Sequence, residues 1–404
     1  MRHSTFAPPT AKDIAEAQRN IRGKAIRTPL IRLRRRRNGG DDYDAPEIYL
    51  KLENLQPLSS FKVRPSANAI ACILSSGGAS LAELRAVGVS TASAGNFAQG
   101  LAWCCADMGI KCTVASPDNA PQVKIDSMRR LGAKVIKVPY SEWWEMIETH
   151  TCPLAPDAFF IHPGAESAVL SGNATIAAEI LEDLHDADCI VAPYGSGALV
   201  TGIACGVRAM TEGNAGNRRR CRVLAAEPST ACPFALSKKA GRACRALDWK
   251  PSFVDGCGGK AVLPEVWELA REVVDGGLAV PLPEIASAIK MLAEDNRIIA
   301  EGAGAIAVAA ALNGMCGNAK KIVCVVSGGG LDTASLVHIL QGKGAPPPSL
   351  DSDDKAEIAQ AFARDMKHVA IGACVGAAAA AAAAVAVSMM ISSSAARPTS
   401  KNAV

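Results

Sequence analysis

Short apolar runs alternate along most of the chain with stretches in which apolar residues recur every three or four positions. The short runs predict strands at 47–53, 87–93, 111–117, 133–139, 189–195, 222–228 and 321–326. The longer stretches predict helices at 97–108, 122–132, 170–184 and 199–210 and a helical region over 282–312, with a loop-rich passage over 140–164. Strands that alternate with helices in this way predict an α/β fold with parallel sheets.

Three segments depart from this alternation. Residues 34–46 form a charged insertion, and 343–368 form a linker rich in proline, serine and aspartate. Residues 369–391 are a 23-residue run without a charge, and 11 of these residues are alanine. That length can span a bilayer, but alanine is only weakly apolar. A tail anchor and a disordered or loosely helical tail therefore remain two open interpretations.

Composition excludes several classes of protein. Of 404 residues 49% are hydrophobic, which excludes global disorder, and a net charge of +4 is too mild to indicate nucleic-acid binding. The 14 cysteines form no C-x-x-C pair, so they do not indicate a zinc site and fit small buried thiols in a reducing compartment. The N-terminus has no apolar signal segment, so we expect a cytoplasmic protein.

Small residues cluster where four predicted strands end: SAGN at 93–96, GSGAL at 195–199, EPSTA at 227–231 and SGGG at 327–330. In open α/β sheets, ligands bind beyond the carboxyl ends of the strands. We therefore expect these four loops to converge on one crevice.

Each loop has a functional and a plain structural interpretation. The N–H groups of 195–199 could bind a phosphate at a helix N-terminus, or the segment could be a plain tight turn. The segment is not the dinucleotide-binding fingerprint, because Val200 stands where the third glycine belongs. Ser93 and Asn96 could hold a carboxylate or cap a helix. Ser327 could donate a hydrogen bond to a ring nitrogen or be a turn serine.

Lys62 lies at a predicted strand-to-helix junction, in SSFKVRPSAN. An isolated lysine is usually solvated, whereas a lysine at such a junction can be buried and reactive. A phosphate loop, a hydroxyl for a ring nitrogen and a buried lysine together indicate pyridoxal 5'-phosphate, whose enzymes need a Schiff-base lysine. Lys62 is our candidate for that lysine.

Several segments resemble motifs of the threonine dehydratase and serine racemase family of pyridoxal-phosphate enzymes. They are SSFKVRPSAN (S-F-K-x-R), SAGNFAQGLA (S-A-G-N-H-A-Q-G), APYGSGALVTGIA (the glycine-rich phosphate loop), AAEPSTA (the E-P segment) and VVSGGGLD (S-G-G-N-x-D). The likeness runs from residue 11 to residue 340. It implies the tryptophan-synthase-β-like fold (fold type II), in which two open parallel-sheet domains hold the cofactor in the cleft between them.

The resemblance also implies a domain division. A large cofactor-binding domain would comprise 11–85 and 166–342, and a small domain 86–165. Around them lie an N-terminal extension at 1–10, the linker at 343–368, the apolar segment at 369–391 and a polar tail at 392–404. The family is usually dimeric, so a homodimer is the implied assembly.

The resemblance assigns roles residue by residue. Lys62 would form the Schiff base and move the substrate's α-proton, Phe61 would pack on the ring, Asn96 would bond the ring's 3-oxygen and Ser327 its nitrogen. Gly195, Ser196, Gly197, Ala198 and Leu199 would hold the phosphate, and Ser93, Ala94, Gly95 and Asn96 would bind the substrate carboxylate. The implied enzyme is an L-serine/L-threonine ammonia-lyase, which removes water and yields a 2-oxo acid and ammonia.

The chain also departs from the family pattern. Phe97 replaces a histidine, and Ser196 and Ala198 stand where glycines are usual, which is costly if those positions need a positive φ. Ala94 replaces the serine of the racemases, which favours dehydration over racemisation. These departures leave a non-catalytic binding or scaffold protein as the alternative function, with serine racemase as a third.

A divalent-cation site of the family is only partly retained. Glu227 and the carbonyl of Ala231 are the candidate ligands, but Cys232 and Pro233 stand where the family has aspartates. This replacement argues against a bound cation.

Overall fold

The computed structural model describes residues 6–35, 45–120, 122–211 and 220–348, which belong to one compact unit, Met1–Ser349. The predicted segments 369–391 and 392–404 and most of the linker lie outside the described residues. Within the described ranges, no helix has both the length and the apolar character needed to cross a membrane.

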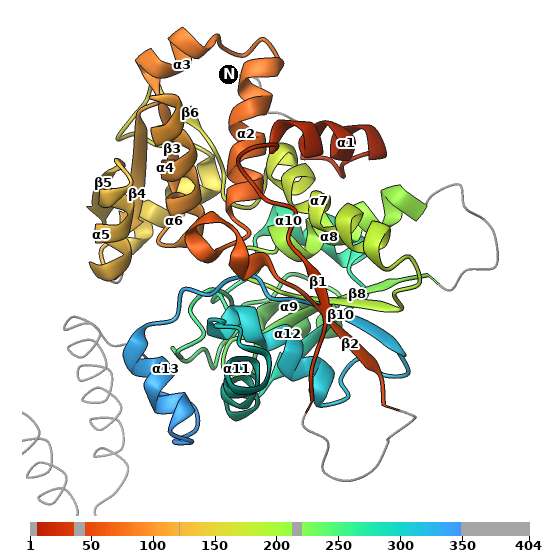
Figure 1. The fold of residues 1–404 in the computed structure, drawn as a ribbon. Helices are drawn as coiled ribbons and strands as arrows, with labels where there is room; N and C mark the ends of the chain where they lie inside the picture. The colour runs from red at the N-terminus through yellow and green to blue at the C-terminus, as the bar shows by residue number, and fades with distance from the viewer. Residues whose placement is uncertain (1–5, 36–44, 121, 212–219, 349–404) are drawn as a thin grey trace, which may run out of the picture. The chain divides into compact units, whose positions relative to one another are not determined.

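Two sheets organise the described residues, and Figure 1 draws the smaller at the upper left and the larger at the lower right. The larger has the order β1-β2-β10-β7-β8-β9 and the smaller β5-β4-β3-β6. The strands are β1 Leu30–Arg32, β2 Glu47–Lys51, β3 Val89–Ala92, β4 Cys112–Pro117, β5 Lys134–Val138, β6 Phe159–Phe160, β7 Cys189–Pro193, β8 Arg222–Pro228, β9 Gly276–Val280 and β10 Lys321–Val325. All pairings are parallel except β1 with β2. The predicted α/β class with parallel sheets is confirmed.

Thirteen α-helices and two short 3-10 turns connect the described strands. They are α1 Ala11–Asn20, η1 Glu53–Leu55, η2 Pro57–Ser59, α2 Val63–Ser75, α3 Leu81–Val87, α4 Asn96–Met108, α5 Gln122–Arg130, α6 Tyr140–Thr149, α7 Ser167–Asp183, α8 Ala198–Thr211, α9 Pro233–Ala240, α10 Pro264–Val273, α11 Leu282–Asn296, α12 Gly302–Leu312 and α13 Thr333–Leu340. One expectation is wrong, because the passage 140–164 contains α6. The helical region expected over 282–312 is confirmed and consists of two helices, because the chain turns at Arg297 with φ 60°.

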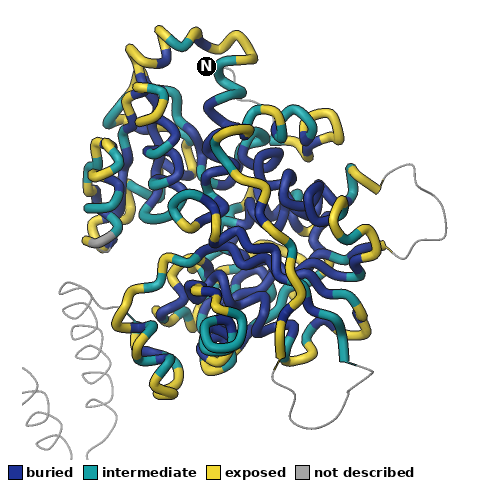
Figure 2. Tube along the Cα trace, viewed as in Figure 1, coloured by how far each residue is buried: buried dark blue, intermediate teal, exposed yellow. Residues whose placement is uncertain are grey.

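Both faces of the larger sheet are covered, as a parallel sheet requires. Along β7, Cys189 and Val191 pack into the core beneath α11 and α12, whereas Ile190 and Ala192 pack against α7 and α8. Figure 2 shows α7 and α8 as mostly buried and α3 as mainly exposed. The smaller sheet is also packed on two faces, and its four strands all lie within the predicted small domain, 86–165. The domain boundaries stay a prediction.

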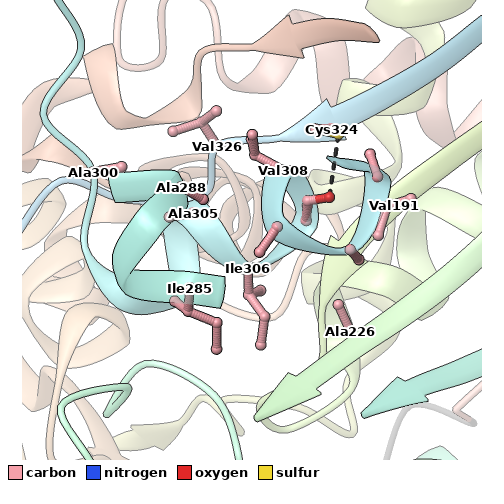
Figure 3. Close-up of a cluster of buried hydrophobic side chains, with 14 of the residues drawn as sticks. Val191, Ala226, Ile285, Ala288, Ala300, Ala305, Ile306, Val308, Cys324 and Val326 are labelled. Carbon is pink, nitrogen blue, oxygen red and sulfur yellow. Dashed lines mark hydrogen bonds between the residues drawn. The ribbon is translucent and has the colours of Figure 1, made fainter. Parts of the chain in front are cut away.

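Helix α12 is buried on every side, because its sequence GAGAIAVAAAL has no polar face. Figure 3 shows Ala305, Ile306 and Val308 of this helix among the strand side chains Val191 and Ala226. The Cys324 thiol of β10 donates to the carbonyl of Ala307 at 3.3 Å. Packing on all sides fixes the N-terminus of α12, where Glu301 precedes the helix.

Candidate functional site

The segment that carries Lys62 is tied to the loop after β10. The Phe61 N–H donates to the carbonyl of Ser327 at 3.1 Å, and Ser60 forms a β-bridge with Gly328. Lys62 then occupies the N-cap position of α2, where its side chain makes no capping hydrogen bond. The helix side of the predicted strand-to-helix junction at Lys62 is confirmed, whereas two 3-10 turns separate Lys62 from the strand β2.

The Lys62 amine lies between two aromatic rings. Its Nζ is 4.8 Å from the centroid of the Phe61 ring and 5.4 Å from that of the Phe97 ring. No described residue forms a hydrogen bond or ion pair with Nζ. Although part of the side chain remains accessible, burial of the amine lowers the pKa of Lys62 to about 8. With this pKa, roughly a tenth of the amine is neutral at pH 7 and about half at pH 8, and the neutral form can act as a nucleophile or base.

The loop of residues 93–96 joins β3 to the N-terminus of α4. The Ser93 N–H donates to Ala115, and its hydroxyl accepts a long bond from the N–H of Gly95 at 3.4 Å. The backbone N–H groups of 96–98 donate to no described residue, so they offer three donors at the positive end of the helix. Ala94 lies in the same loop. The predicted carboxylate site therefore has the donors it needs, although that role stays a prediction.

The loop of residues 195–199 joins β7 to α8. Only Gly197 has a positive φ there, at 88°, while Ser196 and Ala198 do not. The predicted strain from replacing two glycines is therefore absent. The N–H groups of 197–200 donate to no described residue, and a Cβ on Gly195 would lie 3.0 Å from the carbonyl of Gly256. Four free donors at the N-terminus of a helix suit a phosphate better than a plain tight turn.

Ser327 is 2% exposed in the loop after β10, and its hydroxyl donates to the carbonyl of Ala303 at 3.2 Å. That bond orients the hydroxyl but must be given up before Ser327 can donate to a ring nitrogen. The backbone of Ser327 lies beside the residue before Lys62, because its carbonyl accepts the N–H of Phe61.

Glu301 was not identified from the sequence. Its carboxylate is 5% exposed, and Oε1 accepts a hydrogen bond from Asn96 Nδ2 at 3.2 Å. Burial raises the pKa of Glu301 to about 7. The signal that could have found it is a single charged residue at the head of an otherwise uncharged helix, in AEGAGAIAVAAAL.

Contacts between residues far apart in the sequence join these loops into one site. Asn96 meets Glu301, and Lys62 meets Phe97. A Cβ on Gly256, which lies against the loop at 195–199, would be 3.1 Å from Glu301 Oε1. Three of the four predicted loops therefore meet, together with Lys62.

The fourth loop, at 227–231, carries Glu227, whose carboxylate binds the N-terminus of the following helix, α9. The two oxygens of Glu227 accept the N–H groups of Phe234 and Ala235, at 3.0 and 2.9 Å, at the N-terminus of α9. Ala231 lies in the preceding turn, where its N–H donates to Pro228. The described residues hold no group of three His, Cys, Asp or Glu side chains that could bind a metal ion. The donor set at Glu227 and Ala231 does not fit a divalent cation.

A buried group of four charged side chains lies next to the start of α2: Lys51, Glu53, Arg64 and Glu179. We call it the Arg64 network. Arg64 bonds Glu53 through Nε and Glu179 through Nη1, at 2.8 and 2.6 Å, and Lys51 pairs with Glu179 at 2.5 Å. The network joins β2, η1, α2 and α7. It fixes the start of α2, two residues after Lys62.

Comparison with known proteins identifies the family. The model of the family described as "Pyridoxal-phosphate dependent enzyme" matches residues 21–328. The chain belongs to this family. The L-threonine ammonia-lyase of Thermotoga maritima is 36% identical to it, over 82% of this chain and 78% of that protein. The catabolic L-threonine dehydratase of Escherichia coli is 30% identical, over 83% and 98%. The serine racemase structure from Dictyostelium discoideum has 29% identity and a TM-score of 0.67, over 81% and 100%.

These findings confirm the predicted family, fold type and cofactor. The described residues also fit pyridoxal phosphate on their own chemistry. The amine of Lys62 has no partner, the donors of 197–200 are free, and Gly197 leaves no room for a Cβ, which would lie 2.7 Å from Val266 Cγ1. A phosphate, a ring and an aldehyde thus each have a matching group in the site. The role of each single residue stays a prediction.

Proposed function

We propose that the protein is a pyridoxal-phosphate-dependent lyase that removes water from serine or threonine and yields a 2-oxo acid and ammonia. The observation that carries the proposal is Lys62, whose amine is unpaired, sits between two aromatic rings and has a pKa lowered by burial to about 8. Family membership and the two relatives named for threonine support it.

Binding of the cofactor would use groups from four segments. The N–H groups of 197–200 would hold the phosphate, and the Lys62 amine would bind the aldehyde carbon. Phe61 would pack on the ring, Asn96 would donate to its 3-oxygen and Ser327 to its nitrogen. When bound, the cofactor supplies an electron sink for the electron pair left at the substrate's α-carbon.

The chain's own residues would then orient the substrate and move its proton. The free N–H groups of 96–98 would bind the carboxylate, which fixes the α-carbon relative to the lysine. The neutral amine of Lys62 would take the α-proton, because its lowered pKa matches a general base working near pH 8. Phe61 and Phe97 would keep water from the amine. Departure of the β-hydroxyl and return of one water then yield the oxo acid and ammonia.

The activity test is to supply serine and threonine separately to the purified protein with pyridoxal phosphate and to measure ammonia and oxo acid. The proposal expects both products in equal amounts from at least one amino acid. It expects Lys62→Ala to abolish them and Lys260→Ala, a lysine of an exposed loop, to leave them unchanged. Unchanged activity of Lys62→Ala, or no product from the unaltered protein, would refute the proposal.

The alternative, a non-catalytic binding protein, rests on the altered phosphate loop, Phe97 and the altered cation site. The loop carries no strain at Ser196 or Ala198, and Glu227 has its own partners in α9. The absence of strain in the phosphate loop supports catalysis over the alternative. Racemisation is disfavoured because Ala94 has no group that can return a proton.

A homodimer belongs to the same proposal. Three large apolar side chains are about half exposed: Ile26 at 47%, Leu55 at 50% and Ile299 at 45%. Hydrogen bonds hold their segments together, since the Gln56 and Asn54 side-chain amides donate to the carbonyls of Ile26 and Ile299. An apolar patch of this kind supports association. Light scattering of the purified protein would give the mass of a dimer, and a monomer mass would refute the assembly.

The proposal also concerns the location of the protein in the cell. The thirteen described cysteines are all free thiols, which supports a cytoplasmic protein. The tail anchor at 369–391 lies outside the described residues and is kept as a proposal because of its uncharged length. A fluorescent reporter fused to residues 351–404 would label membranes if the anchor exists, and a diffuse signal would refute it.

A further inference from the structure

The mechanism above gives no task to Glu301, although its carboxylate lies in the middle of the site. It accepts a hydrogen bond from Asn96 at 3.2 Å. A Cβ on Gly328 would lie 2.5 Å from Oε1, and a Cβ on Gly330 would lie 3.2 Å from Oε2. The carboxylate therefore lies between Asn96 and the loop that carries Ser327. Asn96 follows β3 of the smaller sheet, and that loop follows β10 of the larger sheet.

The charged surroundings of Glu301 come from three elements. Lys124 of α5 and Asp255 of the loop before α10 form an ion pair at 2.5 Å, and both act on Glu301 with opposite sign. The backbone N–H of Gly330 also lowers the pKa of the carboxylate, and Glu301 in turn contributes to the raised pKa of the Cys257 thiol. Burial is the largest influence and raises the pKa of Glu301 to about 7. Its charge therefore changes within the neutral range.

We propose that Glu301 is a positioning residue that decides which end of the Asn96 amide faces the cofactor. An ionised carboxylate only accepts hydrogen bonds, so it holds the Nδ2 end of Asn96 toward itself. One Nδ2 hydrogen is bound to Glu301 and the second remains to donate. The ionised 3-oxygen of the cofactor ring is an acceptor and requires such a donor. The inference rests on the proposed role of Asn96 in cofactor binding.

Protonation of Glu301 removes this control. A neutral carboxyl can donate to Asn96 Oδ1, so the amide can turn over and present an oxygen where the cofactor needs a donor. Two facing acceptors leave an unpaired polar group, which is costly in a buried site. The hold on the cofactor should therefore weaken as the pH falls through about 7.

The test measures the dissociation constant of pyridoxal phosphate by tryptophan fluorescence quenching, with the full-length protein, from pH 5.5 to pH 9. The variants are Glu301→Gln, Asn96→Ala and the double variant. At pH 8 we expect Glu301→Gln to weaken binding about tenfold, because a glutamine no longer dictates the amide's orientation. In the Asn96→Ala background the same change should have an effect below about twofold.

Two further variants separate positioning from folding. Glu301→Asp keeps an ionisable group and should keep a pH-dependent affinity. Glu166→Gln removes another carboxyl whose pKa desolvation raises to about 7 and whose Oε2 accepts the backbone N–H of His162 at 2.9 Å, and it should leave the dissociation constant unchanged.

The outcomes distinguish this inference from the proposed function. Equal losses from Glu301→Gln with and without Asn96, or a loss at pH 5.5 as large as at pH 8, would overturn the positioning role alone. Failure of the unaltered protein to bind pyridoxal phosphate at any pH would overturn the cofactor site and the inference with it.

Discussion

Removal of the guanidinium of Arg64 should be among the most destabilising single changes in the described chain. Arg64 is fully buried and donates to two carboxylates, through four hydrogen bonds of 2.6 to 2.8 Å. In the Arg64 network two cations face two anions, so the buried charges balance. Arg64→Met leaves Glu53 and Glu179 with Lys51 as their only cation in the network.

The magnitude follows from the uncompensated charge. Breaking a buried ion pair by removing one partner costs about 3–5 kcal/mol, because the other partner stays desolvated. Arg27 provides the matched control, since it also bridges two carboxylates, Glu182 and Asp183, but its side chain is 49% exposed. An exposed pair contributes at most about 1 kcal/mol. Arg27→Met should therefore cost several-fold less than Arg64→Met.

The pH dependence gives the prediction its sign. Burial alone would raise the pKa of Glu179, but Arg64 and Lys51 outweigh it and hold this pKa below its ordinary value. In the unaltered protein the resulting stabilisation is present above the unfolded pKa and lost as the pH falls through the folded one. Without Arg64, burial raises the pKa of Glu179. Protonation of Glu179 then removes the cost of burying its unpaired charge. The difference between variant and unaltered protein should shrink from pH 8 toward pH 5.

Urea unfolding of both variants at pH 8 and pH 5.5 measures these differences. A cost of Arg64→Met no greater than that of Arg27→Met would refute the reasoning. A cost that is large but unchanged between the two pH values would show that lost packing, not charge, is responsible.

The remaining predictions concern the phosphate loop and two buried asparagines. Gly197→Ala should weaken pyridoxal phosphate binding more than tenfold, because its φ is 88° and its Cβ would clash, whereas Ser196→Gly should change the dissociation constant less than about twofold. A large effect of Ser196→Gly would contradict this. Asn68 makes three side-chain hydrogen bonds, so Asn68→Ala should cost about 2–3 kcal/mol in urea unfolding. Asn173 is fully buried, and neither atom of its side-chain amide has a partner in the described chain. Asn173→Ala should therefore lower the free energy of unfolding by about 1 kcal/mol or less. Equal costs for Asn68→Ala and Asn173→Ala would contradict the argument.

Asn96 and Ser327, which the sequence predicted, lie just after strands, and parallel strands bring their carboxyl ends to one edge. Lys62 lies beyond two 3-10 turns after β2, so its sequence motif and not a preceding strand indicated it. At Glu227 the sequence does not show that α9 begins close enough for its N–H groups to donate to both carboxylate oxygens. Which element lies against a side chain is a tertiary property.

Other features needed the backbone itself. A row of small residues does not tell which one needs φ above zero, so Ser196 and Ala198 looked costly although only Gly197 has that conformation. The sequence does not indicate the helix α6 clearly, because its only buried residues are the adjacent Met146 and Ile147, which give no three-to-four-residue spacing. The pairing of Asn96 with Glu301 joins residues 205 positions apart, which no local pattern indicates.

The most direct test of the account is to reduce the protein loaded with pyridoxal phosphate with borohydride and to map the modified peptide by mass spectrometry. The account predicts that a visible absorption band is lost on reduction and that the cofactor's mass is found on Lys62. It also predicts that attachment increases as the pH rises through about 8, where the Lys62 amine becomes neutral. Attachment to another lysine, or none at pH 8, would contradict the claim that Lys62 holds the cofactor.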